Sequence, residues 1–451
     1  MHLAPPPAVV DVARTLEQAG FQAWAVGGAV RDALLGKSAQ DWDIATSARP
    51  EQVRGLFRRT VPIGIDHGTV GVLAGDVLYE VTTFRRDVET FGRHAVVEFA
   101  DSVEEDLARR DFTFNAIAWN PLTDELLDPF GGLDDLRGGR LRTVGAPADR
   151  FAEDHLRVLR ALRFAGHFQL AIDAPTWIAL VAAVPLLSTL SAERVREELT
   201  KVLTKTRRAS ASLSLYATAG ALSPLYPELE ATVGVDAGAD HELDVWTESL
   251  LAIDTLAPTR PRLRLAALFH GLGIPGSRVR DLRGGWRATG HAAVGAALTE
   301  ALMRRLRFSN ADTSTVVELL RMQEQLFPPD SDGARVRRWL HAIGPVDPRD
   351  LFRLRIALCR ANPRAGASGA ADLSERWHLA HHVLMQRPPL RVTDLAIGGD
   401  DLKSLGLRPG PEYRDLLAAL LDRVLDDPTL NTRDALLGLI RAQLERLDPG
   451  A

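Results

Sequence analysis

The sequence has a single cysteine, Cys359, among its 451 residues. An internal disulfide needs two cysteines and a cysteine-based zinc cluster needs several, so both are excluded. No apolar run reaches the length that crosses a membrane, and the N-terminus lacks the basic start and long apolar segment of a secretory signal. We therefore expect a cytoplasmic protein without a membrane segment.

An overall positive charge is also missing, because the formal net charge is −5. General electrostatic attraction to phosphate is thus excluded, although local patches remain possible. The basic residues are nearly all arginine, whose planar fork can stack on bases or hydrogen-bond to them. With 46% hydrophobic and 25% charged residues, the composition is typical of a globular protein, and the length predicts two to four domains.

The segment 24–44 carries the most informative pattern. A short apolar strand runs through Gly27-Gly28 into a helix that begins near Arg31, and a second strand carries Asp41 and Asp43. Two acids separated by one residue point to the same side of a strand and suit Mg²⁺, while a glycine turn can bring backbone N–H groups to a phosphate. Either feature alone is more often a solvated turn or strand edge; the ordered set favours a nucleotide site.

Alternating and helical patterns surround this segment. Apolar residues at helical spacing predict a helix over 8–19, and Pro50 begins another. The runs 69–74 and 76–84 predict two strands. In the second strand, Glu80 faces away from its apolar neighbours, so it is either an exposed acid or a third carboxylate beside the metal pair.

The next segment, 85–99, is rich in charge and without clean periodicity, which predicts a mobile loop returning to a strand. Asp101 or Ser102 can cap the helix that follows. The turn-rich, glycine-paired segment 125–145 then closes the first predicted domain.

Long helical patterns begin after Ala148. A single helix is predicted over 150–168, which makes Asp154 and Arg157 neighbours on its surface. Such a pair is either a simple salt bridge or a rigid set of acceptors and donors for the edge of a base. In the helix over 190–203, Arg194 is expected to brace neighbouring turns. The small-residue segment 362–372 is the best candidate for a linker.

Five motifs in this order resemble the class II tRNA nucleotidyltransferase and bacterial poly(A) polymerase family, whose catalytic part is related to DNA polymerase β. The resemblance is strict over about the first 205 residues, looser to the end, and nearest to the bacterial CCA-adding enzymes. The motifs are GGAVRD with DWD, LARRDFTFNAIA, DPFGGLDDLRGGRLRTVG, RFAEDHLRVLRALRFA and SAERVREEL.

The resemblance implies an α+β fold, with a polymerase-β-like nucleotidyltransferase domain followed by all-α domains. We expect a catalytic head at 1–145, a helical nucleobase-selecting and RNA-binding neck at 146–225, a degenerate HD-like domain at 226–345 and a C-terminal tRNA-binding region at 346–451. It also implies the activity: template-independent addition of C and A nucleotides to the 3′ end of tRNA from CTP and ATP, with no obligatory protein partner.

In this family two carboxylates hold Mg²⁺ for two-metal catalysis, which the resemblance carries to Asp41 and Asp43 and, less directly, to Glu80. It assigns the residues of the glycine turn and its helix to the triphosphate, namely Gly27, Gly28 and Arg31.

The resemblance assigns Arg110 and Asp111 to the ribose of the incoming nucleotide. Asp154 and Arg157 match the pair that reads the Watson–Crick edge of CTP or ATP, and Arg160 with Arg163 completes the expected nucleotide-binding set. Cytosine and adenine both present a donor amino group beside an acceptor ring nitrogen, whereas uracil and guanine present the reverse.

One motif departs from its pattern. The middle segment resembles an HD-type phosphohydrolase domain and keeps His270 and His291, but Gly271 replaces the ligand aspartate and Glu248 stands in place of another histidine. We therefore predict no phosphohydrolase activity and a domain kept for structure or RNA contact.

Three alternatives stay open at the level of the sequence. The protein adds all of CCA, or only the terminal A or only CC, or it is a poly(A) polymerase. The loop with Gly92-Arg93-His94 favours A addition, because CC-adding members are expected to have it shortened. From a different class, a catalytically inactive RNA-binding protein would keep this architecture, although the intact Asp41, Asp43 and Asp111 argue against it.

Overall fold

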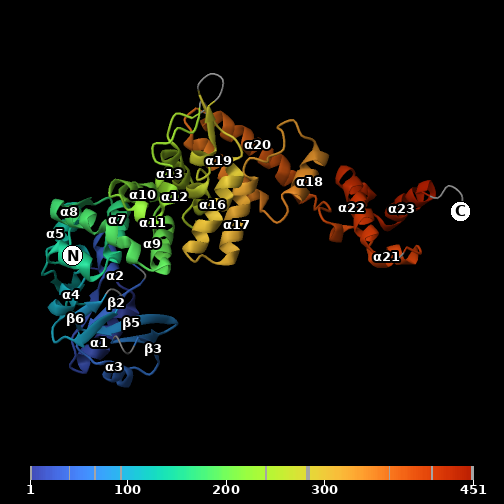
Figure 1. Ribbon diagram of the computed structural model, residues 1–451. Helices are drawn as coiled ribbons and strands as arrows, with labels where there is room; N and C mark the ends of the chain where they lie inside the picture. Colours follow the sequence, from blue (N-terminus) through green and yellow to red (C-terminus); the bar gives the residue numbers. More distant parts are fainter. Residues whose placement is uncertain are drawn as a thin grey trace. The chain divides into compact units, whose positions relative to one another are not determined.

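The computed structural model describes residues 3–39, 41–64, 68–91, 94–238, 241–280, 285–364, 366–407 and 410–447. The chain divides into two compact units, Met1–Pro227 and Glu228–Ala451. The first contains a mixed sheet with helices, and the second is mostly helical (Figure 1). The predicted α+β class is confirmed. Within the described ranges, no helix has the length and apolar composition needed to cross a bilayer.

A seven-stranded sheet forms the centre of the first unit. The β2–β5 pair is parallel and its register sets Ile44 opposite Val81, whereas the other neighbouring strands are antiparallel. The two strands predicted over 69–74 and 76–84 are confirmed as β4 and β5. The strands, in the order of the sheet, are β3 (Thr60–Gly64), β4 (Thr69–Ala74), β5 (Val77–Thr83), β2 (Asp43–Thr46), β1 (Ala23–Val26), β8 (Ala118–Trp119) and β9 (Leu126–Leu127).

Helices pack around this sheet and continue beyond it. The helix predicted over 8–19 is confirmed as α1, whose apolar face is buried. The helices of the first unit are α1 (Pro7–Gln18), α2 (Gly28–Leu34), α3 (Pro50–Leu56), α4 (Val103–Ala108), α5 (Gly132–Arg137), α6 (Pro147–Glu153), α7 (Leu156–Phe168), α8 (Ala174–Ala183), α9 (Ala192–Lys205), α10 (Ala209–Thr218) and α11 (Leu222–Leu225), with the short η2 (Thr113–Asn115) and η3 (Val184–Thr189). A small pair, β10 (Arg140–Leu141) and β11 (Ala171–Ile172), is parallel.

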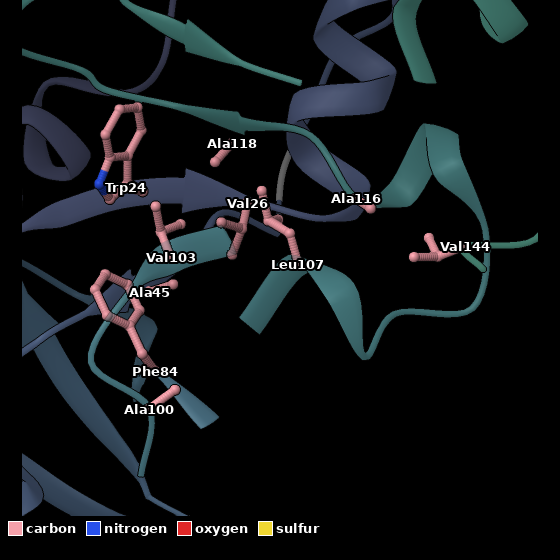
Figure 2. Packing of buried hydrophobic residues seen from close by; sticks show 10 residues of the cluster. All are labelled: Trp24, Val26, Ala45, Phe84, Ala100, Val103, Leu107, Ala116, Ala118 and Val144. Atoms are coloured by element: carbon pink, nitrogen blue, oxygen red, sulfur yellow. The ribbon is translucent and has the colours of Figure 1, made fainter. Parts of the chain in front are cut away.

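A hydrophobic cluster fixes the strands that carry the predicted site (Figure 2). Trp24 and Val26 of β1 and Ala45 of β2 pack with Val103 and Leu107 of α4. The side chains of this cluster are almost fully buried. Burying one large apolar side chain stabilises the fold by about 1.5–3 kcal/mol. The strand ends that project from this cluster are therefore held firmly.

The segment 85–99 differs from its predicted loop. It forms a hairpin in which β6 (Arg85–Phe91) pairs antiparallel with β7 (His94–Phe99). Arg86 lies opposite Glu98 and binds it at 2.9 Å. Charged residues that pair across strands leave no apolar alternation, which explains the wrong prediction. Gly92 and Arg93, on which the prediction of A addition partly rested, lie outside the described residues.

The helix predicted over 150–168 is also wrong, because the structure divides it. Asp154 follows α6 in an extended conformation, with φ −153° and ψ 106°, and α7 begins at Leu156. The Asp154 carboxylate accepts a hydrogen bond from the Leu156 amide at 3.0 Å. This contact satisfies an amide at the start of α7, so the break has a local cause.

The second unit is built from helices around two short strands. Its elements are α12 (Pro227–Glu230, at the boundary), α13 (Val245–Thr255), α14 (Pro261–Phe269), α15 (Ile274–Ser277), β12 (Arg278–Arg280), β13 (Trp286–Ala288), α16 (His291–Arg305), α17 (Asn310–Met322), α18 (Gly333–Ala342), α19 (Pro348–Ala361), α20 (Gly366–Met385), η4 (Val392–Asp394), α21 (Gly399–Ser404), α22 (Pro411–Asp426), η5 (Pro428–Leu430) and α23 (Arg433–Leu447). The predicted linker over 362–372 is wrong from Gly366 onward, because α20 begins there and buries Ala370 and Leu373.

Candidate active site

The two aspartates of the predicted metal pair lie at the start of β2. Asp43 is the first residue of β2, and Asp41 precedes it by two positions. Trp42 between them is buried and its ring lies 6.0 Å from that of Trp119, whereas both aspartates are exposed. This alternation turns both carboxylates to the side opposite Trp42, in agreement with the spacing argument.

Glu80 of β5 lies beside this pair. Ile44 faces Val81 across the parallel strands, so the residues before them, Asp43 and Glu80, are neighbours on the adjacent strands. The side chain of Asp43 reaches solvent but stands inside the cleft, and the partial loss of water there, together with the charges of Glu80 and Asp41, raises its pKa to about 6, while Arg110 opposes this rise. A bound cation relieves such crowding of negative charge, so the carboxylates fit a hard divalent ion.

The three acids do not already form a complete ligand set. Among the described residues, no group of three or more His, Cys, Asp or Glu side chains is arranged to hold a metal ion. The roles of Asp41, Asp43 and Glu80 in metal binding therefore stay predictions.

A glycine turn brings an arginine to these acids. Gly27 has φ +75°, which glycine adopts readily. A Cβ at Gly27 would lie 2.9 Å from Nη1 of Arg110 and 3.9 Å from Oδ2 of Asp43. Arg110 donates to the buried Asp106 and to the carbonyl of Asn115, both at 3.3 Å. The absence of a side chain at Gly27 thus lets a fixed guanidinium approach the metal pair.

Asp111 is a buried, fully bonded carboxylate. One oxygen accepts from the Phe112 amide at 2.9 Å and from the Asn115 amide group at 3.0 Å, and the other accepts from Arg160 at 2.6 Å. Burial alone would raise the pKa of Asp111, but Arg160 and these hydrogen bonds bring it below its ordinary value. Asp111 is therefore ionised and held in one orientation.

Arg31 connects the glycine turn to the same network. Its Nη1 donates to Oδ1 of Asn115 at 2.7 Å, and its Nη2 lies 2.8 Å from Asp32. The guanidinium stacks over Phe168 at 4.6 Å and Phe164 at 5.3 Å. A cation is thus fixed next to the turn that the sequence assigned to phosphate.

The side chains of Asp154 and Arg157 have separate partners, while the backbone amide of Arg157 donates to the carbonyl of Asp154 at 3.0 Å. Asp154 accepts from Nη2 of Arg194 at 2.6 Å. Arg157 binds Glu153 and also donates to the carbonyl of Arg109 at 3.2 Å. The prediction that Arg194 braces neighbouring turns is wrong, because its guanidinium binds Asp154, 40 residues earlier in the chain, and lines the cavity.

Arg163 is held in a buried ion pair. Its Nε donates to Glu198 at 2.6 Å, and Lys201 binds the other oxygen of Glu198 at 2.8 Å. The guanidinium stacks at 4.1 Å over Phe164. Arg163 therefore links α7 to α9 in addition to any part in binding.

One cavity of about 930 Å³ joins these groups, and it lies within the first unit. All twelve residues that the sequence predicted for the site line it. The predicted site residues did not include Asn115, Asp106 and Arg194, which also line the cavity. Asn115 and Arg194 stand within two of the quoted motifs, LARRDFTFNAIA and SAERVREEL, which would have suggested them, whereas Asp106 carries no such signal. The twelve are Gly27, Gly28, Arg31, Asp41, Asp43, Glu80, Arg110, Asp111, Asp154, Arg157, Arg160 and Arg163.

Two family models match the first unit. Residues 23–142 match the poly A polymerase head domain, and residues 169–232 match a probable RNA and SrmB-binding site of polymerase A. The chain is also 31% identical to a CCA-adding enzyme of Levilactobacillus brevis over 436 residues, which cover 95% of this chain and 96% of that protein. The chain belongs to the family of CCA-adding enzymes.

Other members of the family match in part or in fold. A CCA-adding enzyme of Enterococcus faecalis is 48% identical over 194 residues, so the alignment spans about half of that relative, 48% of its length. The crystal structure of the Bacillus stearothermophilus CCA-adding enzyme in complex with CTP superposes with a TM-score of 0.76 at 29% identity, covering 99% of this chain and 100% of that one. Enzymes of this family are nucleotidyltransferases that generally use divalent metal ions.

Proposed function

We propose that this CCA-adding enzyme family member transfers C and A nucleotides from CTP and ATP to the 3′ end of tRNA, without a template and with Mg²⁺, in the cytoplasm. The observation that carries the proposal is the convergence of all twelve motif residues, from segments far apart in the sequence, on one cavity. This set contains acids for a metal, arginines for phosphates and a separate acid and arginine for a base.

Asp41 and Asp43 would hold the metal ions, with Glu80 as the proposed third acid. Bound there, Mg²⁺ would lower the pKa of the RNA 3′-hydroxyl and stabilise the charge of the triphosphate and its pyrophosphate leaving group. Arg31 and Arg110 would neutralise the phosphates, because both guanidiniums are fixed beside the glycine turn. This division of roles needs no protein nucleophile.

Asp154 and Arg157 would select the base. The carboxylate would accept from the amino group of cytosine or adenine, and the guanidinium would donate to the adjacent ring nitrogen. Each already has a protein partner that fixes its orientation, Arg194 for Asp154 and Glu153 for Arg157. A uracil or guanine would leave these groups unpaired, and that loss would discriminate against it.

The decisive experiment incubates the full-length protein with tRNAs that end before CCA, after C and after CC, in CTP or ATP with Mg²⁺. We expect CTP to be incorporated onto the first two and ATP onto the third. Incorporation of ATP alone, onto tRNA ending in CC, would identify an A-adding enzyme. Absence of incorporation on all three would refute the proposed activity.

The metal pair is tested by Asp41→Ala. We expect transfer to fall at least about a thousandfold, because the ion supplies several kcal/mol of charge stabilisation in the transition state. Affinity for tRNA, measured by gel shift, should stay within about twofold. The matched control is Asp11→Ala, which removes an exposed acid bonded to Arg14 on the surface of α1. Equal activity of the two variants would refute the metal assignment.

A further inference from the structure

The second unit contains a cavity of its own, of about 1040 Å³. It is as large as the upper range of small-molecule sites in proteins, about 300–1,000 Å³. Its lining comes from α13, the end of α14, the strands β12 and β13, the end of α17 and α19. Nothing in the proposed transfer reaction uses these groups.

The acids of this cavity already have partners. Nδ1 of His241 lies 2.7 Å from Glu248, and Nε2 of His291 lies 3.3 Å from Glu324. Burial lowers the pKa of His270 to about 4, so its ring is neutral at pH 7. Across the described ranges, no three side chains here or elsewhere are arranged as metal ligands. Both acids of the lining, Glu248 and Glu324, are thus paired with histidines.

Three arginines, in contrast, bring positive charge to the cavity. Arg280, Arg287 and Arg355 all line it. In the part of the chain that the structure describes, none of the three forms an ion pair with a carboxylate. The Nε of Arg355 is buried without a hydrogen-bond partner, and burial lowers the pKa of this guanidinium, partly offset by Glu324. Arg280 and Arg287 are exposed, so Arg355 carries the charge that an anion in the cavity would stabilise most.

Two further groups point to a ligand with a ring and a donor. Gln323 is 2% exposed and its Oε1 has no hydrogen-bond partner, so the cavity holds a buried acceptor that needs an N–H or O–H donor. Trp286 also lines the cavity, and the guanidiniums of Arg278 and Arg280 lie 4.7 and 5.0 Å from its ring. A flat indole beside a guanidinium is a surface on which a base stacks.

We propose that this cavity binds a free nucleotide, with its phosphate at Arg355 and Arg287, its base against Trp286 and a donor group of the base or sugar on Gln323. We assign binding alone to this cavity, and no reaction. It is a second nucleotide site in the chain, made only of residues from the helical unit.

Hydrogen exchange measured by mass spectrometry separates this site from the proposed active site. Full-length protein with saturating AMP should exchange more slowly in peptides that cover β13 and α13, besides any effect in the first unit. Inorganic phosphate at the same concentration should protect these peptides less, because it lacks the base. Protection confined to the first unit would overturn the proposal, and so would protection of the second unit by tRNA but not by AMP.

Equilibrium dialysis with labelled AMP tests the individual contacts. Arg355→Gln should weaken binding to the second unit at least tenfold, because the phosphate loses its buried cation. The control is Arg353→Gln on the same helix, which removes an arginine that pairs with Asp350 and does not line the cavity. Trp286→Ala should also weaken binding. This second variant tests the site even if Arg355→Gln does not fold. Wild-type affinity in both cavity variants would refute the site.

Discussion

Replacing Arg194 with glutamine should free the carboxylate of Asp154, which we assign to base selection, from its fixed orientation. Nη2 of Arg194 donates to Oδ2 of Asp154 at 2.6 Å, and the two side chains are 22% and 23% exposed. A largely buried hydrogen bond between charged groups contributes about 1.5–3 kcal/mol. If the transition state depends on the fixed carboxylate, kcat/KM falls by about 10- to 150-fold.

The assay compares kcat/KM for CTP, ATP, UTP and GTP on the preferred tRNA end. Arg194→Gln should lower kcat/KM for CTP and ATP more than for UTP and GTP, so the discrimination against UTP and GTP decreases. The matched control is Glu197→Gln, an exposed residue of the same helix that does not line the cavity, and it should stay within about twofold of wild type.

A double-mutant cycle with Asp154→Asn measures the coupling directly. If the two side chains act as one unit, the double variant should lose less than the sum of the single variants, with a coupling of about 1.5–3 kcal/mol. Purely additive losses, within about 0.5 kcal/mol, would refute the reasoning that Arg194 acts through Asp154.

Three further predictions concern stability. Gly166→Ala should lower the melting temperature, because the new Cβ would lie 2.3 Å from the backbone of α10. Overpacking of this kind typically costs about 1–3 kcal/mol. Gly55→Ala, which places its Cβ in open space, should leave the melting temperature unchanged. Glu198→Gln should lower the free energy of unfolding in urea by about 3–5 kcal/mol, because Arg163 stays buried without its counter-charge, and a loss below about 1 kcal/mol would contradict this. The pKa of His270 is about 4 in the folded protein, below its ordinary value. Its contribution to the free energy of unfolding is therefore present above about pH 6.5 and is lost as the pH falls toward 4, with about 2 kcal/mol lost by pH 5. His270→Asn should reduce that loss.

Most residues of the candidate site were assigned by the resemblance of five motifs to a known family. The strand period predicted only the common orientation of Asp41 and Asp43 and the exposure of Glu80 between buried neighbours. The fold class was implied by the same resemblance, in agreement with alternating runs in the first part of the chain and helical runs after Ala148.

Local sequence patterns could not predict contacts between residues that are far apart in the chain. The apolar stripe of 150–168 runs through the break at Asp154, because that break depends on a hydrogen bond to the Leu156 amide and an ion pair with Arg194. The hairpin at 85–99 could not be predicted either. Its strands pair through charged residues such as Arg86 and Glu98, so the apolar alternation that indicates a strand is absent.

The small-residue composition of 362–372 led to a wrong prediction of a linker. Small residues after Gly366 suggested a flexible segment, yet alanine favours helices, and α20 packs its Ala370 and Leu373 into the second unit. Small size therefore indicated close packing at this position and not a linker.

Gly27 couples two properties that usually vary independently. Its backbone occupies a left-handed region, and the space above its Cα is filled by the guanidinium of Arg110. A mutation to alanine would thus strain the turn and displace a cation from the acids at the same time. Both constraints act at once, so we expect this position to tolerate fewer substitutions than Gly28, whose φ is ordinary and where an added Cβ would lie 3.5 Å from Nη2 of Arg31, an ordinary van der Waals contact.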